Sequence, residues 1–319
     1  MLMLVTRSYA GEKDLEPIAN LLNACEIVDC LDEYHTVADL QMEFSAPHVN
    51  PDRDLRLWEN SNGDLIAFGQ LWIPTEAHPV DGYLWFRVHP DSRNQGLEAD
   101  VIAWGESRMR EVGRERNAPA QLRASSRDSQ SERIKLFKAH GFQVDRRFLT
   151  LERSLAIPFP DPQFPPGFIC RGNQGKAEAH EWVEMFNESF IDHWNYHPAT
   201  VERRLHWLDH PQYRADLDLV GVAPDGTLAV FCYCCIDTEE NRHTNRNDGW
   251  IDLLGTRRGF RRMGLGRAIL LAGLDCLRAE GITTAKIGVD TQNPNQAQRL
   301  YESVGFQHLH GSLSFVKDL

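Results

Sequence analysis

A glycine- and arginine-rich segment, GTRRGFRRMGLGR, occupies residues 255–267. It contains five arginines and no acidic residue, in a chain whose formal net charge is −12. Glycines allow tight turns and leave backbone amides uncovered. The segment lies between a predicted apolar strand and a predicted amphipathic helix, whose first amides lack internal partners and sit at the positive end of the helix dipole. This combination predicts a binding site for a phosphate-containing ligand.

Two common phosphate-binding motifs do not fit this segment. A P-loop has the pattern GxxxxGK[ST], and no lysine follows the glycines here. The dinucleotide fingerprint has the pattern GxGxxG with an acidic residue about twenty positions later, and this pattern does not occur either. What remains is another kind of phosphate loop, or a glycine-containing helix start with a solvated arginine face.

The spacing Arg261-x-x-Gly264-x-Gly266 resembles the pyrophosphate loop of the GNAT superfamily of acyl-CoA-dependent N-acetyltransferases. Asn293 and the following run LYESVGF, residues 300–306, resemble the second motif of that family. The two motifs occur in the expected order and at the expected separation. The resemblance covers residues 166–319 well and the first half of the chain weakly.

The resemblance implies how acetyl-CoA, the cosubstrate, would bind. Backbone amides from Arg262 to Arg267 would hold the CoA pyrophosphate, and the strand end at residues 253–256 would pair with the pantetheine arm. An amide near Leu254 would polarise the thioester carbonyl. Asn293 would contact the pantetheine or simply cap the following helix. The expected CoA-binding residues are Leu254, Gly255, Thr256, Arg261, Arg262, Met263, Gly264, Leu265, Gly266, Arg267 and Asn293.

Tyr301 matches the general acid of the family, which protonates the departing CoA thiolate. A phenol with an ordinary pKa near about 10 is a reasonable proton donor to a thiolate. The alternative role of Tyr301 is core packing, because it lies on the apolar side of its predicted helix.

The general base is less defined by the sequence. Asp252 is expected to alternate with Trp250 and Leu254 on one face of the strand before the loop, so it could point into the cleft. A structural ion pair between Asp252 and the neighbouring arginines is the alternative. Asp248 and His193 are further candidates.

The acceptor is expected to contact residues 187–198, NESFIDHWNYHP, which contain a dense set of polar and aromatic side chains. The expected acceptor-binding residues are Asp192, His193, Trp194 and Tyr196, with Asn195 among them in the sequence. A helix followed by a turn with an aromatic anchor is the alternative. No metal is expected, because Pro198 follows the histidine pair at 193 and 197 and no third ligand is evident.

Three cysteines, Cys232, Cys234 and Cys235, lie in the apolar run 228–236 without a nearby histidine, so buried packing is expected rather than covalent catalysis. The runs 228–236, 250–254 and 283–289 predict strands. Residues 265–279 predict a helix, and Asn293 with Pro294 predicts the start of another. This order indicates an α/β (α+β) domain with a mixed, mostly antiparallel sheet flanked by helices.

The two halves of the chain resemble each other. Gly96 and Gly264 are 168 positions apart, and Gly141 and Gly305 are 164 positions apart, within similar loop–helix–strand–helix patterns. A proline-rich stretch at 158–166 predicts an extended linker. The expected organisation is therefore two tandem GNAT-like domains, 1–157 and 167–319, joined by this linker, a layout similar to that of mycothiol synthase.

The first copy departs from the pattern at three positions. Glu98 stands where the second copy has Gly266, and a carboxylate there would repel pyrophosphate. Phe137 stands at the position of Tyr301, and Ser129 at that of Asn293. The first domain is therefore expected to be non-catalytic, either structural or completing the acceptor cleft.

Composition narrows the class of protein further. Net acidity argues against a nucleic-acid partner, which requires a basic surface, and could instead attract a cationic amine. Seven cysteines, an odd number without a repeating framework, favour reduced thiols in a cytoplasmic protein. The apolar runs are too short for a signal peptide or a membrane span, so no membrane partner is expected. A monomer or homodimer is expected.

These observations together predict an N-acetyltransferase that moves an acetyl group from acetyl-CoA to a primary amine of a small molecule, by direct attack in a ternary complex. The alternative from another class is a CoA-binding sensor or scaffold without turnover. Within enzymes, the alternative acceptors are an aminosugar, such as an aminoglycoside or a mycothiol precursor, and then a protein terminus.

Overall fold

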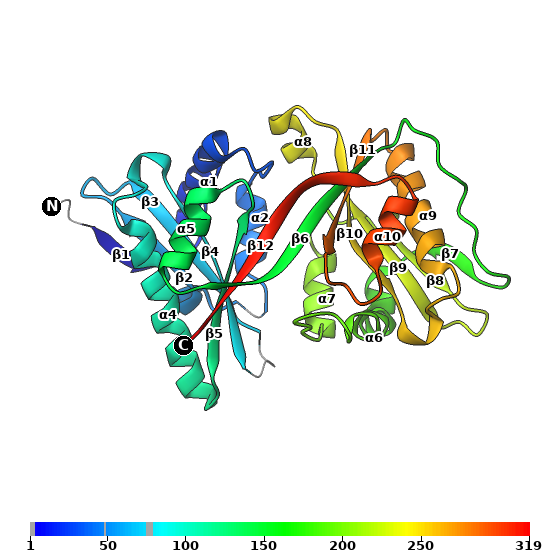
Figure 1. Cartoon of the computed structure of the whole chain (residues 1–319), viewed down its shortest axis with the longest axis horizontal. Helices are drawn as coiled ribbons and strands as arrows, with labels where there is room; N and C mark the ends of the chain where they lie inside the picture. Colours follow the sequence, from blue (N-terminus) through cyan, green and yellow to red (C-terminus); the bar gives the residue numbers. More distant parts are fainter. Residues whose placement is uncertain (1–3, 48, 75–78) are drawn as a thin grey trace. The chain divides into compact units, whose positions relative to one another are not determined.

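A computed structural model describes residues 4–47, 49–74 and 79–319 of the chain (Figure 1). The chain divides into two compact units. Unit 1 comprises Met1–Arg146 and Ser312–Leu319, and unit 2 comprises Arg147–Gly311. The chain therefore passes from unit 1 to unit 2 within strand β6 and returns to unit 1 within strand β12.

Unit 1 is built on a sheet in the order β1-β2-β3-β4-β5, with residues 312–318 of β12 paired antiparallel to β5. Only β4 and β5 pair in parallel among these strands. The strands are β1 (Val5–Ser8), β2 (Leu55–Glu59), β3 (Leu65–Trp72), β4 (Val80–Val88) and β5 (Ala120–Arg127), with β12 (Gln307–Asp318) shared between units. The helices are α1 (Leu15–Asp29), α2 (Val37–Phe44), α3 (Pro51–Asp54), α4 (Leu97–Arg116) and α5 (Ser131–Ala139), with short 3-10 turns η1 (Glu12–Asp14) and η2 (Pro90–Ser92).

Side-chain alternation along the strands gives unit 1 two apolar clusters. In β3, Ala67 and Leu71 pack with Val101 and Met109 of α4, while Phe68 packs with the α1 cluster. Successive strand residues point to opposite faces. Helices α4 and α1 therefore cover opposite faces of this sheet.

Unit 2 repeats the arrangement, with strands in the order β6-β11-β10-β9-β8-β7 and one parallel pair, β10 with β11. The strands are β6 (Gln143–Ser154), β7 (Ile169–Gly172), β8 (Asp218–Val222), β9 (Leu228–Cys235), β10 (Asp248–Thr256) and β11 (Thr284–Asp290). The helices are α6 (Ala179–Phe190), α7 (Val201–Leu208), α8 (Thr238–Thr244), α9 (Leu265–Ala279) and α10 (Ala297–Ser303), with 3-10 turns η3 (Gly175–Glu178) and η4 (Arg258–Phe260). The expected fold class, a mixed and mostly antiparallel sheet flanked by helices in each of two tandem domains, is confirmed.

Helix α9 forms where the sequence predicts it, from Leu265 to Ala279. Its buried face packs in one cluster with β9 and β11, whereas α6 packs in a second cluster around Trp182 and Phe231. The strands β9, β10 and β11 also match their predicted positions to within two residues. The predicted start of the last helix is wrong: α10 begins at Ala297, preceded by Gln296 with a φ of 56°. Asn293 instead accepts a hydrogen bond from the amide of Asn295 (2.8 Å), which makes it part of a local turn.

The units are divided differently from the expected domains. The proline-rich stretch 158–166 does not separate them, because residues 151–154 before it belong to β6, which pairs with β11 of unit 2. Within that stretch, Phe159 and Phe164 pack against the apolar cluster of unit 2. The boundaries lie at Arg146 and again at Gly311, so neither unit is one continuous segment.

The register of the parallel pairs agrees with a duplication. Val80 of β4 pairs with Ala120 of β5, and Asp248 of β10 pairs with Thr284 of β11. The first members of these pairs are 168 positions apart and the second members 164, the same separations as the glycine landmarks in the sequence. None of the helices in the described part of the chain is long and apolar enough to cross a membrane.

Candidate active site

Strands β10 and β11 separate beside the arginine-rich loop. Their parallel ladder ends at Ile251↔Ile287, whereas the ladder between β10 and β9 continues to Thr256. Residues 253–256 therefore pair on one side only. A strand edge of this kind can bond an extended, amide-containing ligand through its backbone. This is the strand end expected to receive the pantetheine arm.

A β-bulge at Asp252 changes the direction of the side chains at this point. The register with β9 shifts between Ile251 and Leu253, so that Leu254 packs toward α9 and Leu253 packs toward α6. The regular alternation expected for Trp250, Asp252 and Leu254 is therefore wrong. A bulge adds one residue to a strand and re-aims its side chains.

The carboxylate of Asp252 is exposed, and it makes no ion pair or hydrogen bond with the described residues. Partial desolvation by its surroundings raises the pKa of Asp252 above the ordinary value for an aspartate. Asp248, by contrast, is only 7% exposed and its carboxylate lies 2.5 Å from the ammonium of buried Lys286. Of the two aspartates on this strand, Asp252 alone is available to accept a proton.

Gly255 brings helix α6 close to β10. A Cβ atom at this position would lie 2.5 Å from the ring of Phe231 and 3.0 Å from Cβ of Ser189. Any larger residue would push these groups apart. The close approach places the C-terminal end of α6 beside the start of the loop.

The loop itself ends in a geometry that exposes the amides of α9. Arg262 and Gly264 both have a positive φ, 65° and 84°, and Gly264 is the N-cap of the helix. The first intrahelical bond is donated by the amide of Ala268 to Gly264 (3.1 Å), which leaves the preceding amides free of helical partners. A Cβ atom added at Gly266 would lie 3.3 Å from Thr256 Oγ1 and 3.7 Å from Leu300 Cδ2, so few atoms of the protein fill the space in front of this glycine. This is the arrangement that binds an anion.

Three of the five loop arginines are held by carboxylates at the end of α6, so the loop does not carry five unpaired positive charges. Arg257 donates from Nε and Nη2 to the two carboxylate oxygens of Glu188, both at 2.8 Å. Arg258 and Arg261 donate to the two oxygens of Asp192 at 2.7 Å. Hydrogen bonding to these arginines lowers the pKa of both carboxyls. We call Glu188, Asp192 and their three arginines the loop clamp.

The other two arginines lie outside the loop clamp. Arg262 is exposed and makes no ion pair or hydrogen bond with any described residue. Arg267 donates to Ser303 Oγ at 3.2 Å, a neutral partner on α10. Met263, between them, is 46% exposed, and Leu265 is buried in the α9 core.

Tyr301 lies on α10 within the same apolar cluster as Leu254 and α9. It is 6% exposed, and its ring packs against Phe306 with centroids 6.2 Å apart. Its hydroxyl makes no hydrogen bond with the part of the chain that the structure describes. Burial, with a smaller effect of the Cys232 thiol, raises the pKa of Tyr301, so the phenol keeps its proton.

The residues predicted to bind the acceptor make contacts with different parts of unit 2. Asp192 faces the loop arginines rather than open space, as described above. His193 Nδ1 lies 3.0 Å from the carbonyl of Trp194, and the Trp194 ring contacts Phe148 of β6 at 5.8 Å. Burial raises the pKa of Tyr196. The structure thus brings Gly255, Thr256, the loop and Tyr301 together in unit 2, and leaves Asn293 in a turn after β11.

The cysteines lie where the sequence predicts packing. Cys232 and Cys234 are fully buried with their sulfurs 3.8 Å apart, and both lie against Gly273 of α9. Hydrogen bonding to Cys232 and burial raise the pKa of Cys234. Among the described residues, no three His, Cys, Asp or Glu side chains are grouped so that they could hold a metal ion.

Unit 1 repeats the loop backbone but fills the site. His89 and Arg257 have φ/ψ values of −51°/136° and −52°/136°, and the two glycine N-caps both have positive φ. The Glu98 carboxylate accepts a hydrogen bond from the amide of Asn94 (3.0 Å). One amide of the unit 1 loop is therefore already bonded to a carboxylate.

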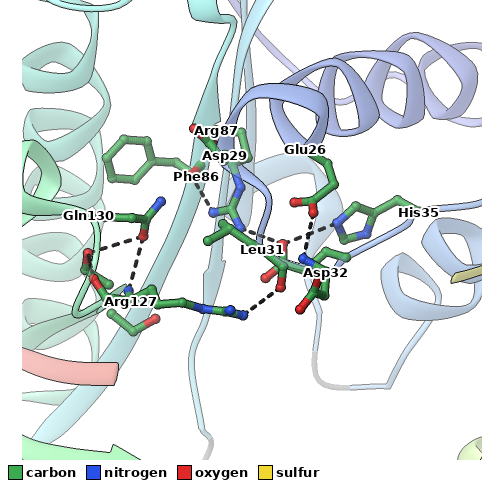
Figure 2. A network of polar contacts seen from close by, with 12 residues as sticks. Glu26, Asp29, Leu31, Asp32, His35, Phe86, Arg87, Arg127 and Gln130 are labelled. Atoms are coloured by element: carbon green, nitrogen blue, oxygen red, sulfur yellow. Dashed lines mark hydrogen bonds and ion pairs between the residues drawn. The ribbon is translucent and has the colours of Figure 1, made fainter. Parts of the chain in front are cut away.

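An arginine covers the unit 1 residue that is equivalent to Tyr301. The guanidinium of Arg133 lies over the rings of Phe86 and Phe137, 4.2 and 5.0 Å from their centroids. Leu31, which is 5% exposed, is tied to the end of β5 because Arg127 donates to its carbonyl at 2.6 Å, and Arg87 donates to Glu33 in the same segment. Figure 2 shows this segment between β5 and α1, where the backbone amide of Arg127 also donates to the side-chain oxygen of Gln130.

Sequence reasoning missed two contributors to the site. Glu188 is one of them: it lies 69 positions before Arg257, so the sequence of the loop does not indicate their ion pair. Phe148 contacts Trp194 across 46 positions of sequence, and no local pattern indicates that contact.

Comparison with known proteins agrees with this geometry. The family described as acetyltransferase (GNAT) matches residues 179–306, which span α6 to the end of α10 and thus the whole loop and Tyr301. This segment belongs to the GNAT acetyltransferase family. The chain is an acyltransferase with two units in tandem.

Similar proteins cover nearly the whole chain. A mycothiol acetyltransferase of Salinispora tropica is 27% identical over 296 residues, which cover 92% of this chain and 89% of that protein. A mycothiol acetyltransferase of Thermobispora bispora is 28% identical and covers 92% of both.

Two solved structures share the fold of the GNAT chain along its length. A GCN5-related N-acetyltransferase from Sphaerobacter thermophilus has a TM-score of 0.73 at 22% identity, covering 99% of this chain and 95% of its own. A tandem GNAT protein from the clavulanic acid biosynthesis pathway has a TM-score of 0.71 at 16% identity, covering 99% and 98%.

Proposed function

We propose that this GNAT protein transfers an acetyl group from acetyl-CoA to a primary amine of a small molecule, by direct attack in a ternary complex. The observation that supports the proposal most is the grouping of three features in unit 2. These are the free amides at the start of α9, the one-sided strand end at residues 253–256, and the unbonded hydroxyl of Tyr301. An anion site, an amide-bonding edge and a proton donor are what a CoA thioester requires.

In the proposed reaction, the amine nitrogen attacks the thioester carbonyl carbon, and an amide near Leu254 polarises the carbonyl. The C–N bond forms, the C–S bond breaks, and the electron pair leaves with sulfur. Tyr301 gives its proton to the thiolate and regains one from water. Asp252 takes the proton lost by the amine, directly or through a water molecule.

The charge states of the two residues suit these roles. A raised pKa keeps Tyr301 protonated until the thiolate forms. A raised pKa also makes the Asp252 carboxylate a stronger base than an ordinary aspartate. The loop would hold the pyrophosphate through the backbone from Arg262 to Arg267, with Asn293 near the pantetheine.

The acceptor class is proposed from the relatives. They are named mycothiol acetyltransferases, which favours an aminosugar such as a mycothiol precursor over a protein terminus. The aromatic pair Trp194 and Phe148, with His193 and Tyr196 nearby in sequence, offers flat apolar surface and polar groups for such a molecule.

Unit 1 is proposed not to bind CoA. Glu98 accepts a hydrogen bond from a loop amide, Arg133 covers the ring that replaces Tyr301, and the position of Tyr301 carries no phenol to protonate a thiolate. Its role would be structural, or to complete the binding of the acceptor.

Thiol release measured with acetyl-CoA and a panel of primary amines, including aminosugars, tests this function. Release of CoA with at least one amine, with the acetyl group recovered on its nitrogen, is the expected result. Tight CoA binding without release for every amine would favour a sensor or scaffold. Failure to bind CoA at all would overturn the proposal.

A further inference from the structure

The two arginines outside the loop clamp differ from the other three in one informative respect. Arg257 donates to Glu188, and Arg258 and Arg261 both donate to Asp192, so each of the three has a carboxylate partner within the fold. Arg262 and Arg267 have no carboxylate partner among the described residues. A guanidinium is a strong, planar donor for phosphate oxygens, so these two are available to a ligand.

The two copies of the loop separate structural arginines from ligand-directed ones. Arg93 in unit 1 stands at the position of Arg261 and donates to both oxygens of Asp29 at 2.6 and 2.8 Å, at the end of α1. Its Nε also donates to the carbonyl of Val88, as Arg261 does to Thr256. This arginine–aspartate pair persists where the site is closed, so it supports the loop rather than a ligand.

The two arginines outside the loop clamp, unlike Arg261, have no arginine at the equivalent positions of unit 1. In unit 1, Asn94 stands in place of Arg262 and Ala99 in place of Arg267. Both positive charges are therefore missing in the copy whose anion site is occupied by Glu98. The two arginines therefore occur in the copy whose helix amides are free, and not in the copy where Glu98 bonds a loop amide.

The backbone already provides for one anionic group. The free amides of α9 and the helix dipole suit the pyrophosphate. A CoA molecule carries a second phosphorylated position, the 3′-phosphate of its ribose, which bears up to two negative charges. Arg267 donates to the neutral Ser303 Oγ and Arg262 is exposed, so the two guanidinium groups flank the first turn of α9 in the sequence without a carboxylate partner.

We propose that Arg262 and Arg267 recognise the 3′-phosphate of the cosubstrate, so that the protein discriminates CoA from 3′-dephospho-CoA. The inference rests on the proposed function, because it assigns a part of the same ligand. It adds a specificity-determining role for two side chains, distinct from the backbone contacts to the pyrophosphate.

Calorimetric titration of CoA and of 3′-dephospho-CoA into the full chain tests this role. The unaltered protein should bind CoA about tenfold or more tightly than 3′-dephospho-CoA, the size expected for hydrogen bonds between charged groups. Arg262→Asn and Arg267→Ala introduce the residues found in unit 1. Each should reduce this ratio several-fold and leave the affinity for 3′-dephospho-CoA nearly unchanged.

The matched control is Arg257→Gln, which removes an arginine of the loop clamp. It should change the affinity for both ligands by the same factor, leaving their ratio as in the unaltered protein. Equal affinity of the unaltered protein for the two ligands would overturn the inference, as would variants of Arg262 and Arg267 that weaken both ligands equally. Failure of both ligands to bind would overturn the proposed function itself, which separates the two outcomes.

Discussion

Replacing Tyr301 with Phe removes one oxygen atom from the proposed proton donor and leaves the rest of the side chain in place. The ring keeps its contact with Phe306 and its position in the α9 cluster. The hydroxyl has no hydrogen-bond partner in the described part of the chain, so its loss leaves no buried group unpaired. We therefore expect the free energy of unfolding to change by less than about 1 kcal/mol.

Unit 1 supports that expectation from within the same chain. Phe137 occupies the equivalent position there, is completely buried, and packs against Phe142 with ring centroids 5.4 Å apart. A phenylalanine thus fits this site of the fold. Any change in turnover of the Tyr301→Phe protein then reports on chemistry rather than on packing.

General acid catalysis contributes about 10²–10⁴-fold to a rate, so kcat should fall by about 10²-fold or more. The dissociation constant for CoA should stay within about twofold, since the hydroxyl is expected to act only as sulfur departs. Thiol release followed with a thiol-reactive dye gives kcat, and calorimetry gives the affinity. Tyr9→Phe, which removes a hydroxyl from unit 1, is the matched control and should turn over normally. A Tyr301→Phe protein with normal kcat would remove this residue from the mechanism, and a parallel loss of CoA affinity would give it a binding role instead.

Three further results are expected. Gly266→Glu should abolish CoA binding in calorimetry, because it places a carboxylate before the free amides as in unit 1. Gly259→Glu is the control and should weaken CoA binding far less, since a Cβ added at Gly259 meets nothing within 4 Å. Equal CoA binding by both variants would mean that the loop is misassigned. In the unaltered enzyme, kcat/KM should fall as the pH drops through the raised pKa of Asp252, since only the ionised carboxylate accepts a proton. Asp252→Asn should lower kcat and abolish this fall. An unchanged pH profile in the variant would exclude Asp252 as the base. Asp248→Ala should destabilise the fold by about 3 kcal/mol in urea unfolding because it leaves the charge of Lys286 buried and unpaired; a loss of turnover without a loss of stability would contradict this structural role.

Local signals were sufficient for the loop and for α9. Glycines, an apolar periodicity and a C-terminal glycine are all read from neighbouring residues, and the helix forms at the predicted positions. The start of α10 was misplaced for a local reason as well. An asparagine followed by proline can cap a helix or close a turn with the same side-chain oxygen, and Asn293 does the latter.

The errors in the site and in the domain boundaries have a different origin. The loop clamp joins residues 66–69 positions apart, so the sequence of the loop does not show that two carboxylates reduce its charge from +5 to +3. The bulge at Asp252 depends on the register with β9, which no pattern within β10 specifies. The boundary at the prolines was wrong because strand pairing outweighed chain composition: β6 pairs with β11 before the prolines begin.

The division of β12 between the units determines the order in which the protein can be completed. Gln121 bonds to Asp318 across 197 positions, and residues 312–318 supply the strand next to β5. During synthesis, unit 1 emerges first but lacks this strand until the far end of unit 2 has also been made. Its β5 edge stays open for that whole interval, exposed to pairing with other chains. The half of the protein that is translated first is therefore the half that finishes folding last.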